Sequence, residues 1–156
     1  MNKIIVIFGL LLALIAGVAF YQFNVKKSAQ PQMKTTEKVT IGTHTFNIEV
    51  VKDPKAQEIG LTKYNSIQND QGMLFVFSTP GIYSFWMRGM TFPIDIIFIK
   101  NNAVISTVEN AQPVKATETN IPIYQPTDPS DTALEINAGL VKKYNIKKSD
   151  TVKIGK

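Results

Sequence analysis

Short apolar segments separated by turn residues dominate the middle of this 156-residue chain, and they limit the folds that it can adopt. The run from Met73 to Phe77 is apolar throughout, which is typical of a strand buried on both faces. From Ile94 to Lys100, one acidic residue is set among isoleucines in a second strand pattern. Strand patterns do not alternate with long helical patterns, which favours a mostly antiparallel arrangement.

Six further segments have the alternation or composition of short strands. Two of the connections are turns that glycine or asparagine favours, at Gly42-Thr43 and at Asn101-Asn102. A long Pro-rich connection from Glu109 to Asp131 interrupts the series. The predicted strands are 39–41, 45–51, 84–88, 103–108, 133–136 and 151–154, with one more short strand expected at 121–124 within the long connection.

Two short helices are predicted beside these strands. Asp53-Pro54 opens the first, because Asp accepts bonds from free N–H groups and Pro suits the first helical position, and Gly60 ends it. Asn137 is expected to cap a second helix over 138–144. The sequence therefore predicts a mainly β (α+β) fold, with a small antiparallel sheet or partly closed barrel and two short helices.

The N-terminal segment has a different composition. Residues 4–23 carry no charged side chain, and 20 such residues are long enough to cross a hydrocarbon core as a helix. We expect a transmembrane anchor or signal segment at 1–25, a flexible linker at 26–38 and a globular domain at 39–156. The domain is expected outside the cytoplasm, either anchored to the membrane or secreted after signal cleavage.

Charge and composition exclude several classes of site. The formal net charge is +5, but Lys3, Lys26 and Lys27 flank the apolar segment, and the remaining 14 Lys and Arg face 12 Asp and Glu. This distribution fits a membrane surface better than nucleic acid. Cysteine is absent and His44 is the single histidine, expected as an exposed turn residue, so we predict no metal site and no cofactor.

Five motifs in order carry a family resemblance. They are Gly60-Leu61, then GMLFVF at 72–77, FWMR at 85–88, FPIDIIFI at 92–99 and LEINAG at 134–139. With these motifs the chain resembles the domain of unknown function 192 family. Thr62 and Gly89-Met90 depart from the residues that the family usually has. The resemblance implies a compact, largely β domain and supplies no reaction.

Asp95 is the first candidate for a functional residue. A carboxylate in an apolar strand is costly to bury unless it is hydrogen-bonded or paired. It can bind loop N–H groups, or it can form a bidentate pair with Arg88 on a neighbouring strand. It can instead serve as a pocket acid or a ligand acceptor.

Glu135 is the second candidate, in a strand where it faces away from Leu134 and Ile136. Glycosidases use a pair of carboxyl groups on opposite walls of a cleft, so Asp95 and Glu135 are candidate catalytic residues. Large apolar side chains in the same region can line a pocket or can simply form the core. The predicted binding residues are Trp86, Met87, Arg88, Met90, Asp95 and Glu135.

The function that these observations favour is a non-enzymatic, extracytoplasmic module that binds a small ligand, a glycan or an envelope protein. The alternative is a hydrolase that acts on an envelope polymer, with Asp95 and Glu135 as the acid/base pair. A purely structural accessory protein is the third reading. A sealed Asp95 would weigh against the hydrolase.

Overall fold

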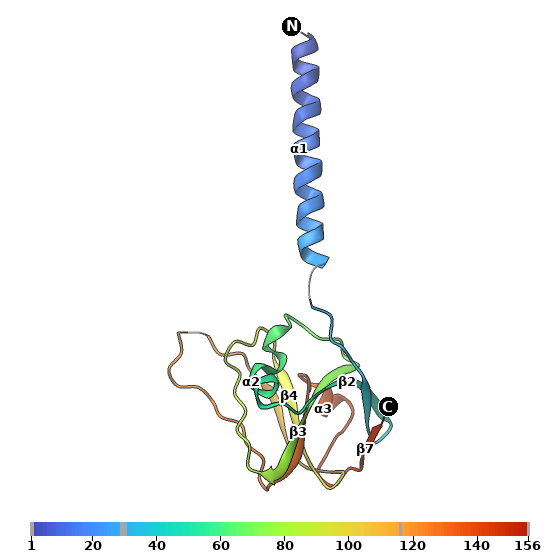
Figure 1. Cartoon of the computed structure of the whole chain (residues 1–156), viewed down its shortest axis with the longest axis vertical. Helices are drawn as coiled ribbons and strands as arrows, with labels where there is room; N and C mark the ends of the chain where they lie inside the picture. The colour runs from blue at the N-terminus through green and yellow to red at the C-terminus, as the bar shows by residue number, and fades with distance from the viewer. Residues whose placement is uncertain (1, 29–30, 116, 156) are drawn as a thin grey trace. The chain divides into compact units, whose positions relative to one another are not determined.

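The computed structural model describes residues 2–28, 31–115 and 117–155. The chain divides into two compact units, residues 1–31 and 32–156. In the first unit, residues Asn2–Ser28 form one continuous helix, α1 (Figure 1). Among the described residues, no helix has the length and hydropathy needed to cross a membrane, so the expected transmembrane helix is not supported.

Regular structure occupies both ends of the predicted linker 26–38. Helix α1 continues to Ser28, and the first strand of the second unit begins at Glu37. Residues 29 and 30 of this linker lie outside the described residues.

The second unit is built on one curled sheet, and over residues 31–115 and 117–155 it contains seven strands. Their order across the sheet is β5-β4-β6-β3-β2-β1-β7. Three short helices connect them (Figure 1). The elements are β1 (Glu37–Ile41), β2 (His44–Val51), α2 (Pro54–Ile59), η1 (Gly60–Lys63), β3 (Gln71–Gly81), β4 (Ile94–Lys100), β5 (Ala103–Ala111), β6 (Ser130–Asn137), α3 (Leu140–Lys143) and β7 (Val152–Gly155).

The predicted mainly β class is confirmed, and the sheet curls into a half-barrel. Strands β2 and β3 are parallel, however, so the sheet is mixed rather than antiparallel throughout. Helices α2 and η1 form the crossover that a parallel pair needs. The curl brings the edge strands β5 and β7 together, where Ala103 bridges Thr151 and the Val104 N–H donates to the Asp150 carbonyl over 3.0 Å.

Both predicted hairpins form with the expected turns. Strands β1 and β2 pair antiparallel across Gly42-Thr43, and β4 pairs with β5 across Asn101-Asn102. The two asparagines have φ values of 49° and 58°. Asn tolerates this left-handed region better than most residues, which explains why this turn could be predicted.

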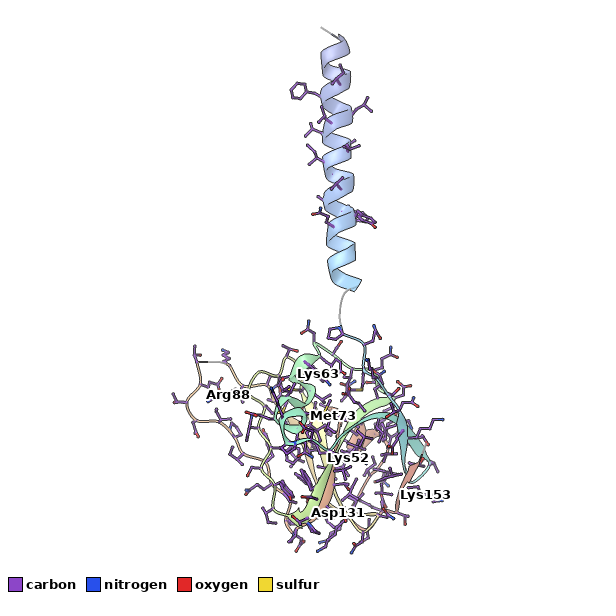
Figure 2. The ribbon with its side chains drawn as sticks, in the orientation of Figure 1. Lys52, Lys63, Met73, Arg88, Asp131 and Lys153 are labelled. Atoms are coloured by element: carbon purple, nitrogen blue, oxygen red, sulfur yellow. The ribbon has the colours of Figure 1, made fainter. Side chains whose placement is uncertain are left out.

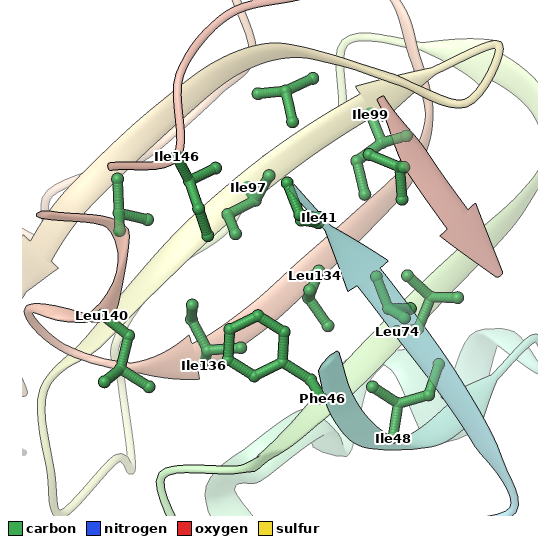
Figure 3. Close-up of a cluster of buried hydrophobic side chains, with 14 residues drawn as sticks. Ile41, Phe46, Ile48, Leu74, Ile97, Ile99, Leu134, Ile136, Leu140 and Ile146 are labelled. Atoms are coloured by element: carbon green, nitrogen blue, oxygen red, sulfur yellow. The ribbon is translucent and has the colours of Figure 1, made fainter. Parts of the chain in front are cut away.

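The concave face of the sheet encloses the first hydrophobic cluster. Side chains from all seven described strands meet there, including Phe46, Leu74, Ile97 and Leu134, and α3 with Ile146 closes one end (Figure 3). These residues are fully or almost fully buried. Burial of this apolar area supplies most of the favourable free energy of folding for a domain of this size.

The convex face of the sheet carries a second hydrophobic cluster. Met73, Phe75 and Phe98 belong to it, and α2, η1 and the segment 82–93 cover it (Met73 is labelled in Figure 2). Because both faces are covered, β4 and residues 72–75 of β3 are buried on both sides. This confirms the prediction for the first part of the apolar run 73–77, whereas Val76 and Phe77 are half-buried.

Three local predictions need correction. Residues 84–88 and 121–124 are not regular strands; they meet through an isolated bridge between Phe85 and Tyr124. Asn137 does not cap the second helix, because its side-chain amide donates to the Ile67 carbonyl over 2.9 Å and α3 is only Leu140–Lys143. His44 is half-buried rather than exposed, with its ring stacked on Tyr144 at a centroid distance of 3.6 Å.

Candidate functional site

Glu135 is a buried carboxyl on the convex face of the sheet. It lies in the middle of β6, opposite Met73 of β3 and Ile96 of β4. Strand alternation sends Leu134 and Ile136 into the concave cluster and Glu135 to the other side. Its exposed fraction is 8%, and its carboxyl has no hydrogen-bond or ion-pair partner among the described residues.

Burial has a direct electrostatic consequence for this group. Loss of water around the carboxylate raises the pKa of Glu135 to about 8, because a low-dielectric environment disfavours the charged form. Most Glu135 side chains are therefore protonated and neutral at pH 7. A neutral carboxyl can donate one hydrogen bond, and an ionised one can only accept.

Glu135 lines a cavity of about 240 Å³, which we call the Glu135 pocket. The rest of its wall comes from α2, η1, the second half of β3 and the segment 82–93. Glu58 of α2 is the other carboxylate in this wall. Five aromatic side chains complete it: Phe75, Phe77, Tyr83, Phe85 and Trp86.

The aromatic wall is largely a connected set of rings. Phe77 stacks on Tyr83 at a centroid distance of 3.6 Å, and Phe85 meets Phe75 edge to face at 5.3 Å. Trp86 is 49% exposed at the rim. Such edge-to-face and stacked pairs hold rings in fixed positions, so the wall is preorganised.

Helix α2 is fixed against this wall by three local features. The Asp53 carboxylate accepts from the Ala56 N–H over 3.1 Å, which caps the helix at its start. The Gln57 side chain donates to the Val76 carbonyl over 2.9 Å, where the pairing of β3 with β6 lapses. Gly60 ends α2 with φ of 52°, a backbone conformation that favours glycine, and it lies next to the Phe75 ring.

A second cavity lies on the other side of Trp86. It measures about 560 Å³ and shares Glu58, Thr62 and Trp86 with the Glu135 pocket, so the two are contiguous. Arg88 and Ile123 also line it, and we call it the Arg88 cavity. The Arg88 side chain is exposed and makes no ion pair within the described part of the chain.

The segment that carries Trp86 and Arg88 is held by the long connection after β5. Phe85 and Tyr124 exchange backbone hydrogen bonds of 2.8 and 2.9 Å. The Val114 N–H donates to the Met87 carbonyl over 3.3 Å. The connection 112–129, of which residue 116 lies outside the described residues, therefore forms part of the wall of the Arg88 cavity.

Asp95 occupies a very different environment on the concave face. Its exposed fraction is 0%, and both carboxylate oxygens accept backbone hydrogen bonds of 2.8 Å, from Asn110 and from Val141. Between Ile94 and Ile96 the β4–β5 register shifts, and Asn110 there has φ of 56°. Asp95 therefore satisfies the N–H group that this bulge would otherwise leave unpaired, and it also binds the first turn of α3.

The predicted pairings of Asp95 do not form. Asp95 and Glu135 project from opposite faces of adjacent strands, so the sheet itself separates the two carboxyls. An acid/base pair must share one cleft, and this arrangement argues against the hydrolase reading. Nor does Asp95 pair with Arg88, because backbone N–H groups from β5 and α3 bind both of its oxygens.

The other predicted site residues divide between the pocket walls and the core. Trp86 and Met90 line the Glu135 pocket together with Glu135, and Trp86 and Arg88 line the Arg88 cavity. Met87 is 1% exposed and packs in the convex cluster instead. No group of three or more His, Cys, Asp or Glu able to hold a metal occurs among the described residues.

Sequence reasoning missed Glu58, Phe77 and Tyr83 as pocket residues. Glu58 lies on a helix that was predicted, but its face could not be assigned from a helix of six residues. Phe77 belongs to an apolar run and Tyr83 follows a turn, so neither carries a distinct signal. The usable signals were the carboxyl at Glu135 among apolar neighbours and the large apolar side chains of Trp86 and Met90.

One comparison with known proteins identifies a family, and another finds similar solved structures. The model of a family described as "Uncharacterized ACR" (DUF192) matches residues 35–154. A protein of unknown function from Novosphingobium aromaticivorans DSM 12444 has a similar crystal structure, with 31% identity, a TM-score of 0.67, and coverage of 74% of this chain and 83% of that one. No curated protein matches the chain.

A second solved structure is similar over most of the domain. It is a Sinorhizobium meliloti 1021 protein described as a "putative transcription regulator", with 27% identity and a TM-score of 0.69. The match covers 79% of this chain and 97% of that one. On the family match over residues 35–154, the chain belongs to the domain of unknown function 192 family.

Proposed function

We propose that this chain is a non-enzymatic module that binds a small molecule in the Glu135 pocket. One observation carries the proposal: a buried carboxyl without a partner among the described residues lies in the wall of a cavity that is otherwise rich in aromatic rings. A buried polar group left unpaired costs about 1–3 kcal/mol. A ligand that supplies the missing partner recovers this free energy on binding.

The dimensions of the pocket limit the ligand. Pockets for drug-sized ligands measure roughly 300–1,000 Å³, and the Glu135 pocket at about 240 Å³ is slightly smaller. The ligand therefore has an apolar body of a few heavy atoms in contact with Phe85 and Trp86, and one polar group that reaches Glu135. A single sugar ring or the end of a longer glycan is one class to test.

A thermal-shift screen of the full chain tests this proposal. The panel contains envelope sugars, glycan fragments, nucleotides, small amines and neutral alcohols. A ligand at 100 times its dissociation constant stabilises the fold by about 2.7 kcal/mol, which moves the melting temperature by several degrees. We expect a hit that is lost in Glu135→Leu and retained in Arg88→Gln, since Arg88 lines only the neighbouring cavity.

Two outcomes would contradict the proposal. A hit that survives in both Glu135→Leu and Trp86→Ala would place binding elsewhere on the domain. The absence of any hit, with wild type and both variants indistinguishable across the panel, would favour a structural accessory role.

Membrane attachment through residues 4–23, with the domain outside the cytoplasm, is a separate proposal. The absence of charge in these residues supports it, as does the exposure of apolar side chains such as Leu12, Leu14 and Ile15 on α1. Lipid would remove this apolar surface from water. Fractionation tests attachment: the full chain is expected in membranes after a carbonate wash, and a chain without residues 1–31 in the soluble fraction. A mature N-terminus downstream of residue 17 would show cleavage and secretion instead.

A further inference from the structure

We infer that the ligand of the Glu135 pocket is an organic cation, such as an amine or a quaternary ammonium group on a small apolar body. This inference rests on the proposed function and names the chemical class of its ligand. Three properties of the wall support it: the sign of its charges, the nature of its rings and the state of its buried carboxyl.

The charged residues of the wall are acids. Glu58 of α2 lies at the exposed rim and Glu135 of β6 lies in the buried part, while Tyr83 is the remaining ionisable residue of the wall. Neither Lys nor Arg is among the described residues that line this pocket; Arg88 lines the neighbouring Arg88 cavity. A ligand that enters therefore meets negative charge from Glu58, and also from Glu135 once it ionises near pH 8, and this favours a cation over a carboxylate or phosphate.

The aromatic side chains of the wall favour the same ligand. The face of an aromatic ring carries partial negative charge, and a cation within about 6 Å of the ring centre is attracted to it. Five rings line this pocket, and Trp86, the strongest ring for such contacts, is half exposed at its rim. Aromatic side chains that line a pocket bind quaternary ammonium groups by supplying both apolar contact and electrostatic attraction.

The buried carboxyl of Glu135 also favours a cation. Asp95, the other buried carboxylate of the sheet, accepts hydrogen bonds from two backbone N–H groups, whereas no described residue donates a hydrogen bond to Glu135. A cation next to Glu135 would provide an opposite charge, which no described residue provides. Burial raises the pKa of Glu135 to about 8, so the carboxylate that attracts the cation becomes the major form above this pH.

Choline and its uncharged carbon analogue, in which a tert-butyl group replaces the trimethylammonium group, are a matched pair of probes. The two have nearly the same shape and differ in charge. Neither titrates between pH 6 and pH 9, so any pH dependence comes from the protein. Trp86 is the single tryptophan of the chain, and its fluorescence reports occupancy of the pocket directly.

We expect choline to change the Trp86 fluorescence of the full chain and to bind about tenfold more tightly at pH 9 than at pH 7, as Glu135 ionises. The uncharged analogue should bind at least tenfold more weakly than choline at pH 9 and should not gain affinity with pH. Glu135→Gln should remove the pH dependence, because its side chain cannot ionise. Glu109→Gln, an exposed substitution in β5 that lines neither cavity, should retain the pH dependence and serves as the matched control.

The outcomes separate this inference from the proposed function. If the uncharged analogue binds as tightly as choline at pH 9, the pocket binds small molecules but the cation inference is wrong. If neither probe changes Trp86 fluorescence or the melting temperature at millimolar concentration, the cation inference is also wrong, and the broader screen decides whether the pocket binds anything. Choline affinity that is unchanged in Glu135→Gln at every pH would likewise overturn it.

Discussion

Each face of the sheet buries one carboxyl, and the two carboxyls differ in their hydrogen bonding. Asp95 faces the concave cluster, where two backbone N–H groups at 2.8 Å bind its oxygens. Glu135 faces the convex side, where aromatic rings surround it and no described residue binds it. The strands that carry them are neighbours, with Asp95 paired to Ile136.

This contrast separates structural from functional candidates more clearly than burial alone does. A buried charge that is fully hydrogen-bonded holds the fold together, as Asp95 holds β4, β5 and α3. A buried carboxyl without partners weakens the fold once it is ionised, and carboxyls with strongly shifted pKa values are concentrated at functional sites. Glu135 is therefore the carboxyl on which the proposed binding site rests, and Asp95 belongs to the scaffold that supports the sheet.

The largest effect is expected from the ionisation of Glu135. Its pKa rises from an ordinary 4.5 to about 8 on folding, so between these pH values the folded state binds the proton more tightly and stability falls as pH rises. One pKa unit is worth about 1.4 kcal/mol, so the full difference is on the order of 5 kcal/mol. We expect Glu135→Gln to unfold like wild type at pH 5 and to be several kcal/mol more stable at pH 9.

Urea unfolding from pH 4.5 to pH 9 measures this difference. Glu58→Gln is the control, because its carboxylate is exposed on α2 and should leave the pH profile of wild type unchanged. A stability difference between Glu135→Gln and wild type that is the same at every pH would show that Glu135 finds a partner in the folded protein.

Asp95→Asn is expected to destabilise the domain by about 3 kcal/mol. The amide keeps the shape but replaces one accepting oxygen by a donor, which then faces either the Asn110 or the Val141 N–H group. Chemical denaturation at pH 7 measures the loss. Glu109→Gln, an exposed substitution in β5, should change the free energy of unfolding by less than about 0.5 kcal/mol. A similarly small change for Asp95→Asn would remove its structural role.

Trp86→Ala and Met87→Ala compare a pocket residue with a core residue at neighbouring positions of the chain. Met87 is 1% exposed in the convex cluster, so its truncation should cost about 2–4 kcal/mol of stability. Trp86 is 49% exposed at the pocket rim, so its truncation should cost about 1 kcal/mol and weaken ligand binding about tenfold. Denaturation and calorimetric titration would contradict this assignment if Trp86→Ala destabilised the domain more than Met87→Ala does.

Arg88→Gln is expected to have the smallest effect on stability, below about 0.5 kcal/mol. Its guanidinium is exposed and makes no ion pair with any described residue. Thermal unfolding at low and high salt measures the effect. A loss above 1 kcal/mol that high salt abolishes would reveal an ion pair and would reopen the pairing of Arg88 with Asp95.

Much of the fold follows from local signals in the sequence. The Asn101-Asn102 turn, the Asp53 cap and the β4 pattern each depend on neighbours within a few residues, and each forms as expected. The parallel pairing of β2 with β3 was missed, because a crossover of two short helices resembles any loop between antiparallel strands. Asn137 was misassigned because its partner, Ile67, is 70 residues away in sequence.

The candidate site could be predicted only in part. Alternation along β6 predicts that Glu135 and Leu134 point to opposite faces of the sheet. It cannot show which residues of the neighbouring strands share a face with Glu135. Asp95 and Glu135 were treated as a pair because both were acids among apolar residues. Their separation by the sheet depends on strand order and register, and these are set by long-range pairing rather than by either local sequence.

The most direct test of the account is an NMR titration of the Glu135 side-chain carboxyl in the folded full chain, with Glu135→Gln used to assign the signal. The account predicts that the carboxyl carbon shift changes with a midpoint near pH 8, because no described residue stabilises the ionised form in the unliganded pocket. A midpoint near the ordinary 4.5 would contradict it, since Glu135 would then be hydrated or paired and would not mark a site that awaits a partner.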